Sequence, residues 1–348
     1  MAMKKRKTGV SRVGRVLGRV LLIVAETLLL LFLAAYTLMY ILAKGPSPTA
    51  SRLFVMSVRE TSAIGFLANW FFTDEEIAAM SAPVEKEYVP TDTSLVTISA
   101  ETGAEADAWG LVDEDGDGII VEPGKGEGYS GFMMIVKDPS RVIMGSDPDA
   151  YRKEGFTVAE FVEKFDGVAA INAGGFYDPD GQGDGSIPDS VVVYDGEIYY
   201  PEFGCREGFV GMDSNYILHV ADFMSVDEIR QNNIQYGVCF GPVLVQNGQG
   251  RDASAMYSGL NPRTAIGQRS DGAILLLVID GRQAISMGAS YADEMEIMLR
   301  YGAVNACNLD GGSSTLLWFQ GGYINNCASV IGIRDIPTSW VVLKEGRG

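Results

Sequence analysis

Two aspartates in the C-terminal half of the chain have the same local context. Asp280 follows the apolar run 274–279, Asp310 follows the run 306–309, and a glycine comes directly after each acid. Such runs predict buried strands, so each carboxylate should emerge where a strand meets a cleft. A carboxylate in this position can carry acid–base or nucleophilic chemistry. Each Asp-Gly segment alone could be a plain turn. Because the same context occurs twice, a functional interpretation is favoured.

The residues after Asp310 add hydrogen-bond donors. Gly311 and Gly312 allow backbone N–H groups to approach a ligand oxygen closely, and Ser313 and Ser314 add hydroxyl groups. This composition is typical of a loop that binds oxyanions or sugar hydroxyls.

Three arginines and one asparagine complete the set of polar candidates. Arg263, Arg282 and Arg334 lie near the two glycine turns, and the guanidinium group binds phosphate through a planar fork of donors. They therefore suit an anionic substrate, although each one taken singly could form a surface salt bridge. Asn172 follows another apolar run and can donate to a sugar hydroxyl or a phosphate, whereas the loop 178–185 behind it is either a lid or a cation-binding loop.

A calcium loop is a further possibility between residues 113 and 124. Asp113, Asp115 and Asp117 supply oxygens at alternate positions, and Gly118 stands at the sixth. Position twelve is Gly124, where a bidentate glutamate is expected. A turn that joins two strands is the alternative.

Histidine and cysteine chemistry has little support. The single histidine, His219, lies in the strand-like run 216–220 without a GxSxG motif, so we expect a packed strand residue. The four cysteines permit three pairings and spacing does not choose among them, while buried thiols are equally plausible. No CxxC pair is present, which disfavours a cysteine zinc site. The cysteines are Cys205, Cys239, Cys307 and Cys327.

The N-terminus predicts a membrane anchor. Residues 1–19 contain seven of the 27 basic residues, and residues 20–43 contain one charged side chain, Glu26. This apolar segment can span a bilayer as a helix, and the basic cluster should stay in the cytoplasm. We expect a single-pass signal anchor in the plasma membrane with the remainder of the chain outside the cytoplasm. A cleaved signal peptide is the alternative.

The remainder of the chain is strongly acidic. Beyond residue 19 it carries 20 basic against 45 acidic side chains. Such a surface repels the phosphate backbone, so we expect no nucleic-acid partner.

The periodicity predicts an α+β domain after the anchor. Residues 44–108 are expected to form a membrane-proximal helical stalk and linker, and residues 109–348 a single catalytic domain. Helical stretches are predicted at 157–165, 226–233 and 290–301. Strands and helices do not alternate regularly, which indicates mixed or antiparallel sheets packed with helices. Strand-like runs are 131–136, 168–171, 191–194, 209–212, 242–246, 274–280 and 315–319.

Several of these segments together resemble the phosphodiester glycosidase family, which has many bacterial members associated with exopolysaccharide. The resemblance covers roughly residues 125–345, and no single piece would suffice. One position departs from the pattern: many relatives have histidine before Pro-Arg-Thr, where this chain has Asn261. The matching segments are 171–176, 240–245, 261–267, 278–282, 286–288 and 308–314, with Arg334 after them.

The resemblance implies hydrolysis of the glycosidic C–O bond of a sugar-1-phosphodiester in a cell-surface or extracellular glycan. Asp310 and Asp280 would be the catalytic carboxylates. No cofactor is required, and Ca²⁺ is the only candidate. Alternatives are a non-catalytic protein that binds exopolysaccharide or cell-wall polymer, and a metal-dependent phosphodiesterase that cuts the P–O bond. The sequence leaves the sugar and the oligomeric state open. The residues expected to bind substrate are Asn172, Arg263, Thr264, Arg282, Gly311, Gly312, Ser313, Ser314 and Arg334.

Overall fold

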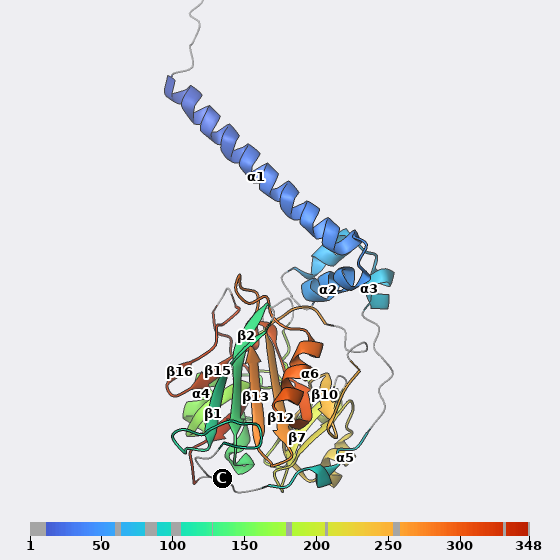
Figure 1. The fold of residues 1–348 in the computed structure, drawn as a ribbon, viewed down its shortest axis with the longest axis vertical. Coiled ribbons are helices and arrows are strands. Elements are labelled where there is room, and N and C mark those ends of the chain that lie inside the picture. The colour runs from blue at the N-terminus through green and yellow to red at the C-terminus, as the bar shows by residue number, and fades with distance from the viewer. Residues whose placement is uncertain are drawn as a thin grey trace, which may run out of the picture.

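A computed structural model shows a long N-terminal helix joined through short helices to a body of three sheets (Figure 1). Predictions that fall on residues 1–11, 81–88 and 99–105, within the basic tail and the linker, lie outside the described residues. The structure describes residues 12–59, 64–80, 89–98, 106–126, 128–178, 183–205, 208–252, 258–329 and 332–346.

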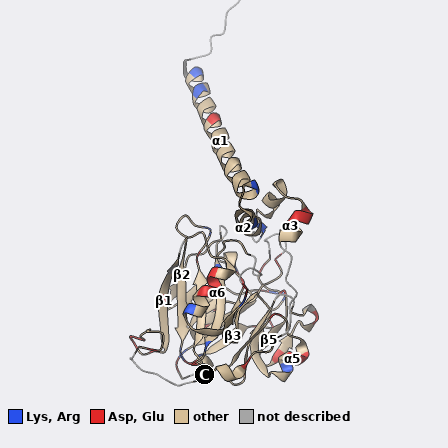
Figure 2. Cartoon of the chain, turned by 45° about the vertical axis from the view of Figure 1, so that its right-hand side comes forward, with Lys and Arg blue, Asp and Glu red and all other residues tan. Residues whose placement is uncertain are grey.

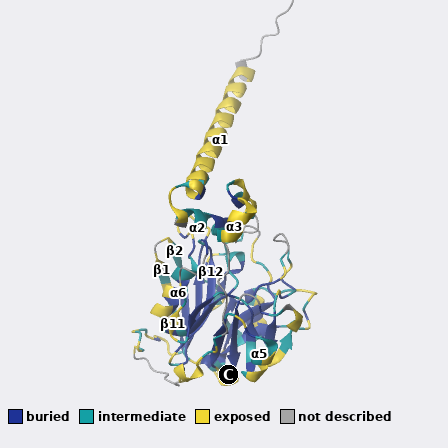
Figure 3. Cartoon of the chain, turned by 90° about the vertical axis from the view of Figure 1, so that its right-hand side faces the viewer, coloured by how far each residue is buried: buried dark blue, intermediate teal, exposed yellow. Residues whose placement is uncertain are grey.

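Helix α1 is a single uninterrupted helix, Arg12–Lys44. Figure 2 shows basic segments near both of its ends with one acidic segment between them. Figure 3 shows that α1 is exposed along nearly its whole length. Its residues Gly14–Lys44 are long and apolar enough to cross a membrane.

Three short helices follow α1 and pack on its last turns. They are α2 (Pro48–Arg59), the 3₁₀ helix η1 (Gly65–Trp70) and α3 (Asp74–Met80). Phe71 packs against Tyr36 and Tyr40 of α1, with ring centroids 5.7 and 6.4 Å apart. Lys44 lies over the Phe72 ring at 4.0 Å. These contacts hold the three helices beside the C-terminal end of α1.

The first sheet has seven strands, all antiparallel to their neighbours, in the order β1-β2-β13-β12-β14-β10-β11. In β13, Ile274, Leu276 and Val278 face a core shared by all three sheets, while Leu275, Leu277 and Ile279 face a second core under helix α6. Burial of both faces explains why this strand is continuously apolar. The strands are β1 (Ile119–Gly126), β2 (Tyr129–Val136), β10 (Val243–Gln246), β11 (Gln249–Gly250), β12 (Arg263–Arg269), β13 (Ile274–Ile279) and β14 (Ala303–Asn308).

Two five-stranded sheets complete the body, in the orders β16-β15-β4-β17-β3 and β6-β5-β9-β7-β8. The second sheet contains β3 (Val142–Ser146), β4 (Gly167–Asn172), β15 (Leu317–Phe319), β16 (Gly322–Tyr323) and β17 (Thr338–Leu343). The third contains β5 (Val192–Tyr194), β6 (Glu197–Tyr199), β7 (Phe209–Asp213), β8 (Leu218–Ala221) and β9 (Ile234–Val238).

One helix packs on the outer face of each sheet. Helix α6 (Tyr291–Arg300) covers the first sheet, α4 (Val158–Lys164) the second and α5 (Val226–Gln231) the third. Each begins with a serine or threonine cap and an acid three residues later, which hydrogen-bond to each other's backbone. All three predicted helices are therefore confirmed, as is the α+β class with antiparallel sheets.

Candidate active site

Ends of three central strands of the first sheet, β12, β13 and β14, lie together at one end of the sheet. Arg263, which begins β12, pairs with Ile279 at the end of β13. Ala265 pairs with Asn308 at the end of β14. Because neighbouring strands run in opposite directions, the start of β12 lies beside the ends of the other two. The segments before β12 and after β13 and β14 therefore converge at this end.

A cavity of about 610 Å³ lies where these segments converge. This size suits a ligand of sugar-phosphate dimensions. Its described lining consists of Gly175, Phe176, Asp178, Asp189, Phe240, Asn261, Arg263, Arg282, Tyr291, Asn308, Leu309, Asp310, Gly311, Gly312, Ser313, Ser314 and Arg334.

Asp310 lies directly after β14, and its backbone is fixed from β4. Its N–H donates to the carbonyl of Ala173 at 3.0 Å, and its own carbonyl accepts from Asn172 Nδ2 at 2.5 Å. Burial raises the pKa of Asp310 to about 7, against a hydrogen bond from Ser314 that lowers it. The Asp189 carboxylate adds to the rise. Asp310 can therefore exchange a proton near neutral pH.

Asp189 was not recognised from the sequence. It precedes β5, and its carboxylate lies so close to Gly175 that a Cβ there would be 2.5 Å from Asp189 Oδ2. Glycine at 175 is thus a condition for this carboxylate to line the cavity. The only sequence signal was its position next to an apolar run, here before the strand and not after it.

The loop after Asp310 folds onto the segment that precedes β12. The N–H of Gly312 donates to the carbonyl of Pro262 at 3.0 Å, and Gly312 has a φ of +63°. A Cβ on Gly311 would lie 2.8 Å from the Pro262 oxygen, and one on Gly312 would lie 3.1 Å from Nη2 of Arg282. Both glycines are therefore needed for this close approach. Ser313 and Ser314 line the cavity beside them.

Arg282 and Asn261 form one polar patch of the wall. Arg282 Nη2 donates to Asn261 Oδ1 at 3.2 Å. Asn261 thus lies in the cavity wall, and it orients a guanidinium group.

Arg263 is a buried wall residue whose guanidinium makes several contacts. Its Nε donates to the Ala289 carbonyl at 3.0 Å and its Nη2 to the Gly259 carbonyl at 2.8 Å. The guanidinium also stacks on the Tyr291 ring, 4.1 Å from the centroid. These contacts fix its orientation, so it contributes a positive charge and a rigid surface to the cavity.

Arg334 pairs with Asp178. The sequence analysis assigned Asp178 no role of its own and left the 178–185 loop as either a lid or a cation-binding loop. Nη1 and Nη2 donate to the two carboxylate oxygens at 2.6 and 2.8 Å. Nη2 also donates to the Gly183 carbonyl at 3.0 Å. This pairing lowers the pKa of Asp178 and raises that of Arg334, so both remain charged.

Asn172 and Thr264 do not line the cavity, although we expected them to bind substrate. Both are fully buried, and Thr264 Oγ1 donates to Asn172 Oδ1 at 2.9 Å. Asn172 Oδ1 also accepts from the Leu316 N–H at 3.2 Å, and its amide nitrogen holds the Asp310 carbonyl. The two residues therefore position the Asp310 loop from behind.

Asp280 also lies outside the cavity lining, which corrects its expected place beside Asp310. Its Oδ1 accepts from the backbone of Asn326 at 2.9 Å and from Asn325 Nδ2 at 3.2 Å. Its Oδ2 accepts from Asn326 Nδ2 at 2.8 Å. With these donors on a carboxylate that is only 3% exposed, Asp280 fastens the 325–326 turn to the end of β13.

The predicted calcium ligands lie at the opposite end of the first sheet. Asp113, Asp115 and Asp117 bring oxygens within 4.8 Å of one another just before β1. The Lys137 ammonium lies 3.1 Å from Asp113 and neutralises part of the negative charge that would attract a cation. This cluster is separated from the cavity edge by the length of β13, roughly 17 Å for its rise.

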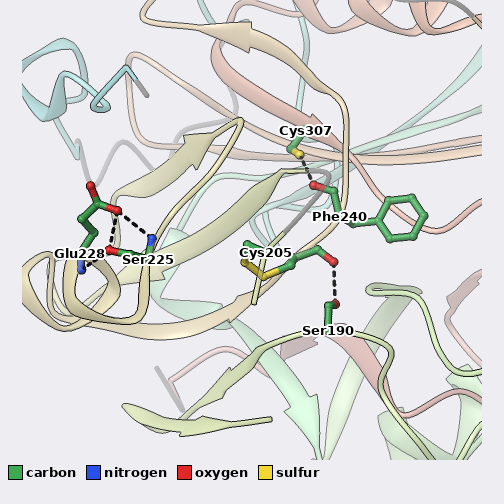
Figure 4. The surroundings of a disulfide bond; sticks show 7 residues. Ser190, Cys205, Ser225, Glu228, Phe240 and Cys307 are labelled. Atoms are coloured by element: carbon green, nitrogen blue, oxygen red, sulfur yellow. Dashed lines mark hydrogen bonds between the residues drawn. A yellow bond between two sulfur atoms is a disulfide. The ribbon is translucent and has the colours of Figure 1, made fainter. Parts of the chain in front are cut away.

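A disulfide joins Cys205 and Cys239 close to two wall residues (Figure 4). Ser190, next to Asp189, donates to the Cys239 carbonyl at 3.0 Å, and Cys307 Sγ donates to the Phe240 carbonyl at 3.4 Å. The cross-link therefore braces the wall that carries Asp189 and Phe240. Cys307 and Cys327 are not disulfide-bonded.

His219 lies outside the cavity lining and is a packed strand residue, as expected. It is buried in β8, and its Nε2 lies 3.1 Å from Asp213 Oδ2.

The chain is similar in sequence to known proteins. A family model described as phosphodiester glycosidase matches residues 165–343. The SPbeta prophage-derived uncharacterized protein YomE of Bacillus subtilis is 33% identical over 186 residues, which are 50% of this chain and 28% of YomE. The chain thus spans little more than a quarter of that relative.

The solved catalytic domain of zebrafish N-acetylglucosamine-1-phosphodiester alpha-N-acetylglucosaminidase, auto-inhibited by its pro-peptide, has a similar fold. The TM-score is 0.55 at 18% identity, over 75% of this chain and 89% of the zebrafish domain. Since the family model covers just over half of the chain and includes Asp189, Asp310 and all three arginines of the cavity, this protein belongs to the phosphodiester glycosidase family.

Proposed function

We propose that this protein hydrolyses the glycosidic bond of a sugar-1-phosphodiester in a cell-surface or extracellular glycan, within the cavity that contains Asp310. One observation carries the proposal: a carboxyl group with a pKa of about 7 shares a cavity with three guanidinium groups. Membership of the phosphodiester glycosidase family favours the same reaction.

In the proposed reaction Asp310 is the general base. Its carboxylate takes a proton from water while the water oxygen bonds to the anomeric carbon. The bond from that carbon to the bridging oxygen breaks, and its electron pair remains on the phosphate. The products are a free sugar and a phosphomonoester. A base with a pKa near 7 is well matched to this step at neutral pH.

The leaving phosphate gains negative charge, which the proposed site has groups to stabilise. Arg282 and Arg334 present guanidinium donors, and the glycine-serine loop at 311–314 lies beside them. The described lining holds three arginines and three aspartates, so protonation of Asp310 leaves an excess of one positive charge. Fixed donors aimed at developing charge lower the barrier because they need no reorganisation.

Substitution of Asp310 with an isotope readout tests the proposal. We expect Asp310→Asn to lower kcat for a sugar-1-phosphodiester by about a thousandfold, the usual loss on removal of a general base. In ¹⁸O-labelled water the wild-type protein should place the label in the sugar. Label in the phosphate would instead indicate P–O cleavage, and binding without turnover would indicate a glycan-binding protein. Full activity of the variant would refute the role of Asp310.

We also propose that α1 anchors the protein in the membrane with the sheets on the extracytoplasmic side. Its length and apolar composition support insertion, and the basic residues before and within its first turns support a cytoplasmic N-terminus. Full-length protein mixed with vesicles should float with them in a density gradient after alkaline washing. Protein that stays at the bottom of the gradient would contradict the anchor.

A further inference from the structure

The end of α1 is linked to the cavity wall by a short series of contacts. Only residues 45–47 separate α1 from α2. In α2, Ser57 Oγ accepts from the Leu260 N–H at 3.0 Å, and a Cβ on Gly259 would lie 2.2 Å from the Ser57 nitrogen. The Gly259 carbonyl in turn accepts from Arg263 on the cavity wall at 2.8 Å.

The end of the first sheet at which the cavity lies is therefore the end nearest to α1. Figure 1 shows α2 and α3 between α1 and this part of the body, with α5 at the far end. An apolar core fixes these helices to one another, and it includes Ala43 of α1, Val55 of α2 and Phe72, which lies between η1 and α3.

Exposed apolar side chains gather at the same end of the molecule. Ile285 is 82% exposed and Met287 57% exposed in the loop that follows β13, between the wall residues Arg282 and Tyr291. In η1, Phe66 and Trp70 are also exposed. Aromatic and aliphatic groups in such a position are typical of residues that lie in the headgroup region of a bilayer.

The tether also limits how far the cavity can move from the bilayer. Three residues between α1 and α2 span at most about 10 Å when fully extended. A reacting group fixed far out in a wall or capsule would therefore be beyond reach, whereas one at the membrane surface lies next to the cavity.

We propose that the substrate is a glycosyl phosphodiester carried by a lipid in the same membrane that holds α1. This inference rests on the proposed hydrolysis of sugar-1-phosphodiesters and specifies what lies on the other side of the phosphate. The lipid chain stays in the bilayer, the sugar and phosphate enter the cavity, and the exposed loop with Ile285 and Met287 rests on the lipid surface.

The test uses the full-length protein in neutral phosphatidylcholine vesicles and two substrates with the same reacting group. One is the phosphodiester of N-acetylglucosamine 1-phosphate with methanol, in solution, and the other is the phosphodiester of the same sugar phosphate with a long-chain dialkylglycerol, in the same vesicles. We expect the lipid-borne ester to be cleaved about tenfold faster or more at equal total concentration, because the membrane raises its effective concentration at the cavity.

Insertion of a 20-residue Gly-Ser linker between Gly45 and Pro46, combined with Phe71→Ser to release the packing of Phe71 on Tyr36 and Tyr40 of α1, should remove this advantage. The linker adds roughly 25 Å of flexible reach and leaves the contact between Ser57 and Leu260 in place. The rate on the lipid-borne ester should fall toward that on the methyl ester, and the methyl ester rate should stay unchanged.

A matched pair of substitutions separates surface contact from general damage. Ile285→Ser should lower the rate on the lipid-borne ester alone, whereas Phe223→Ser, an exposed aromatic residue next to α5 at the far end, should lower neither rate. Equal rates of the wild-type protein on both esters, or a linker variant that keeps the preference, would overturn the inference. Cleavage of neither ester would instead refute the proposed hydrolysis of this reacting group.

Discussion

Asp280 follows β13 and Asp310 follows β14, at the same end of the first sheet, yet the two carboxylates have different surroundings. The Asp280 carboxylate accepts hydrogen bonds from Asn325 and Asn326, three in all, and does not face the cavity. Asp310 lines the cavity, and burial next to Asp189 raises its pKa to about 7. Fixed donors surround the first carboxylate, whereas burial raises the pKa of the second.

This difference separates a carboxylate that is held by fixed donors from one that lines a cavity. Donors that surround a carboxylate occupy most of its lone pairs and leave little room for a substrate. A carboxylate that lines a cavity and has a pKa near 7 can gain or lose a proton near neutral pH and can act on a ligand. The two sites should therefore respond in opposite directions when the charge is removed.

The largest expected contrast is in the stability of Asp310→Asn and Asp280→Asn. The folded-state pKa of Asp310 lies about three units above its ordinary value, so ionisation of this group costs the folded state up to roughly 4 kcal/mol. That cost is absent below pH 4, grows as the pH rises and is complete above pH 7. Asp310→Asn removes it, so the variant should unfold at a higher temperature than the wild-type protein at pH 8, with a smaller difference at pH 5.

Asp280→Asn should lower the free energy of unfolding by about 3 kcal/mol, because buried donors lose a charged acceptor. The measurement is thermal unfolding of full-length variants in the same detergent at both pH values. If Asp280→Asn left the stability unchanged, or if Asp310→Asn lowered it at pH 8, the proposed contrast between the two sites would be wrong.

The sequence predicted that both acids follow strands, but it could not tell which of them lines the cavity. An apolar run followed by Asp-Gly reports where a strand ends, which holds for both residues. It does not report which donors the remaining chain brings to the carboxylate. For Asp280 these come from Asn325 and Asn326, more than forty residues later, on a turn that no periodicity marks.

The same limit explains the missed carboxylates. Asp189 enters the cavity only because Gly175 leaves room for it, and Asp178 only because it pairs with Arg334. Gly175 and Asp189 lie on the segment that joins β4 of the second sheet to β5 of the third. Asp178 and Arg334 lie 156 residues apart, after β4 and before β17 of the second sheet. In contrast, the arginines and the 310–314 loop were found because their motifs carry the chemistry locally.

Two substitutions with opposite effects on the pKa of Asp310 test how its neighbours set that pKa. Ser314→Ala removes a hydrogen bond that favours the charged form, so the pKa of Asp310 should rise. If Asp310 is the general base, the acidic limb of kcat/KM should then move to higher pH, with a loss at pH 6 of about tenfold beyond the loss at pH 8. Asp189→Asn removes a like charge, so the limb should move to lower pH whatever the change in maximal rate. The pH profile of each variant between pH 5 and 9 is the measurement. Shifts of the same sign in both variants would mean that the acidic limb reports a group other than Asp310, and Asp310 would lose its place as the base.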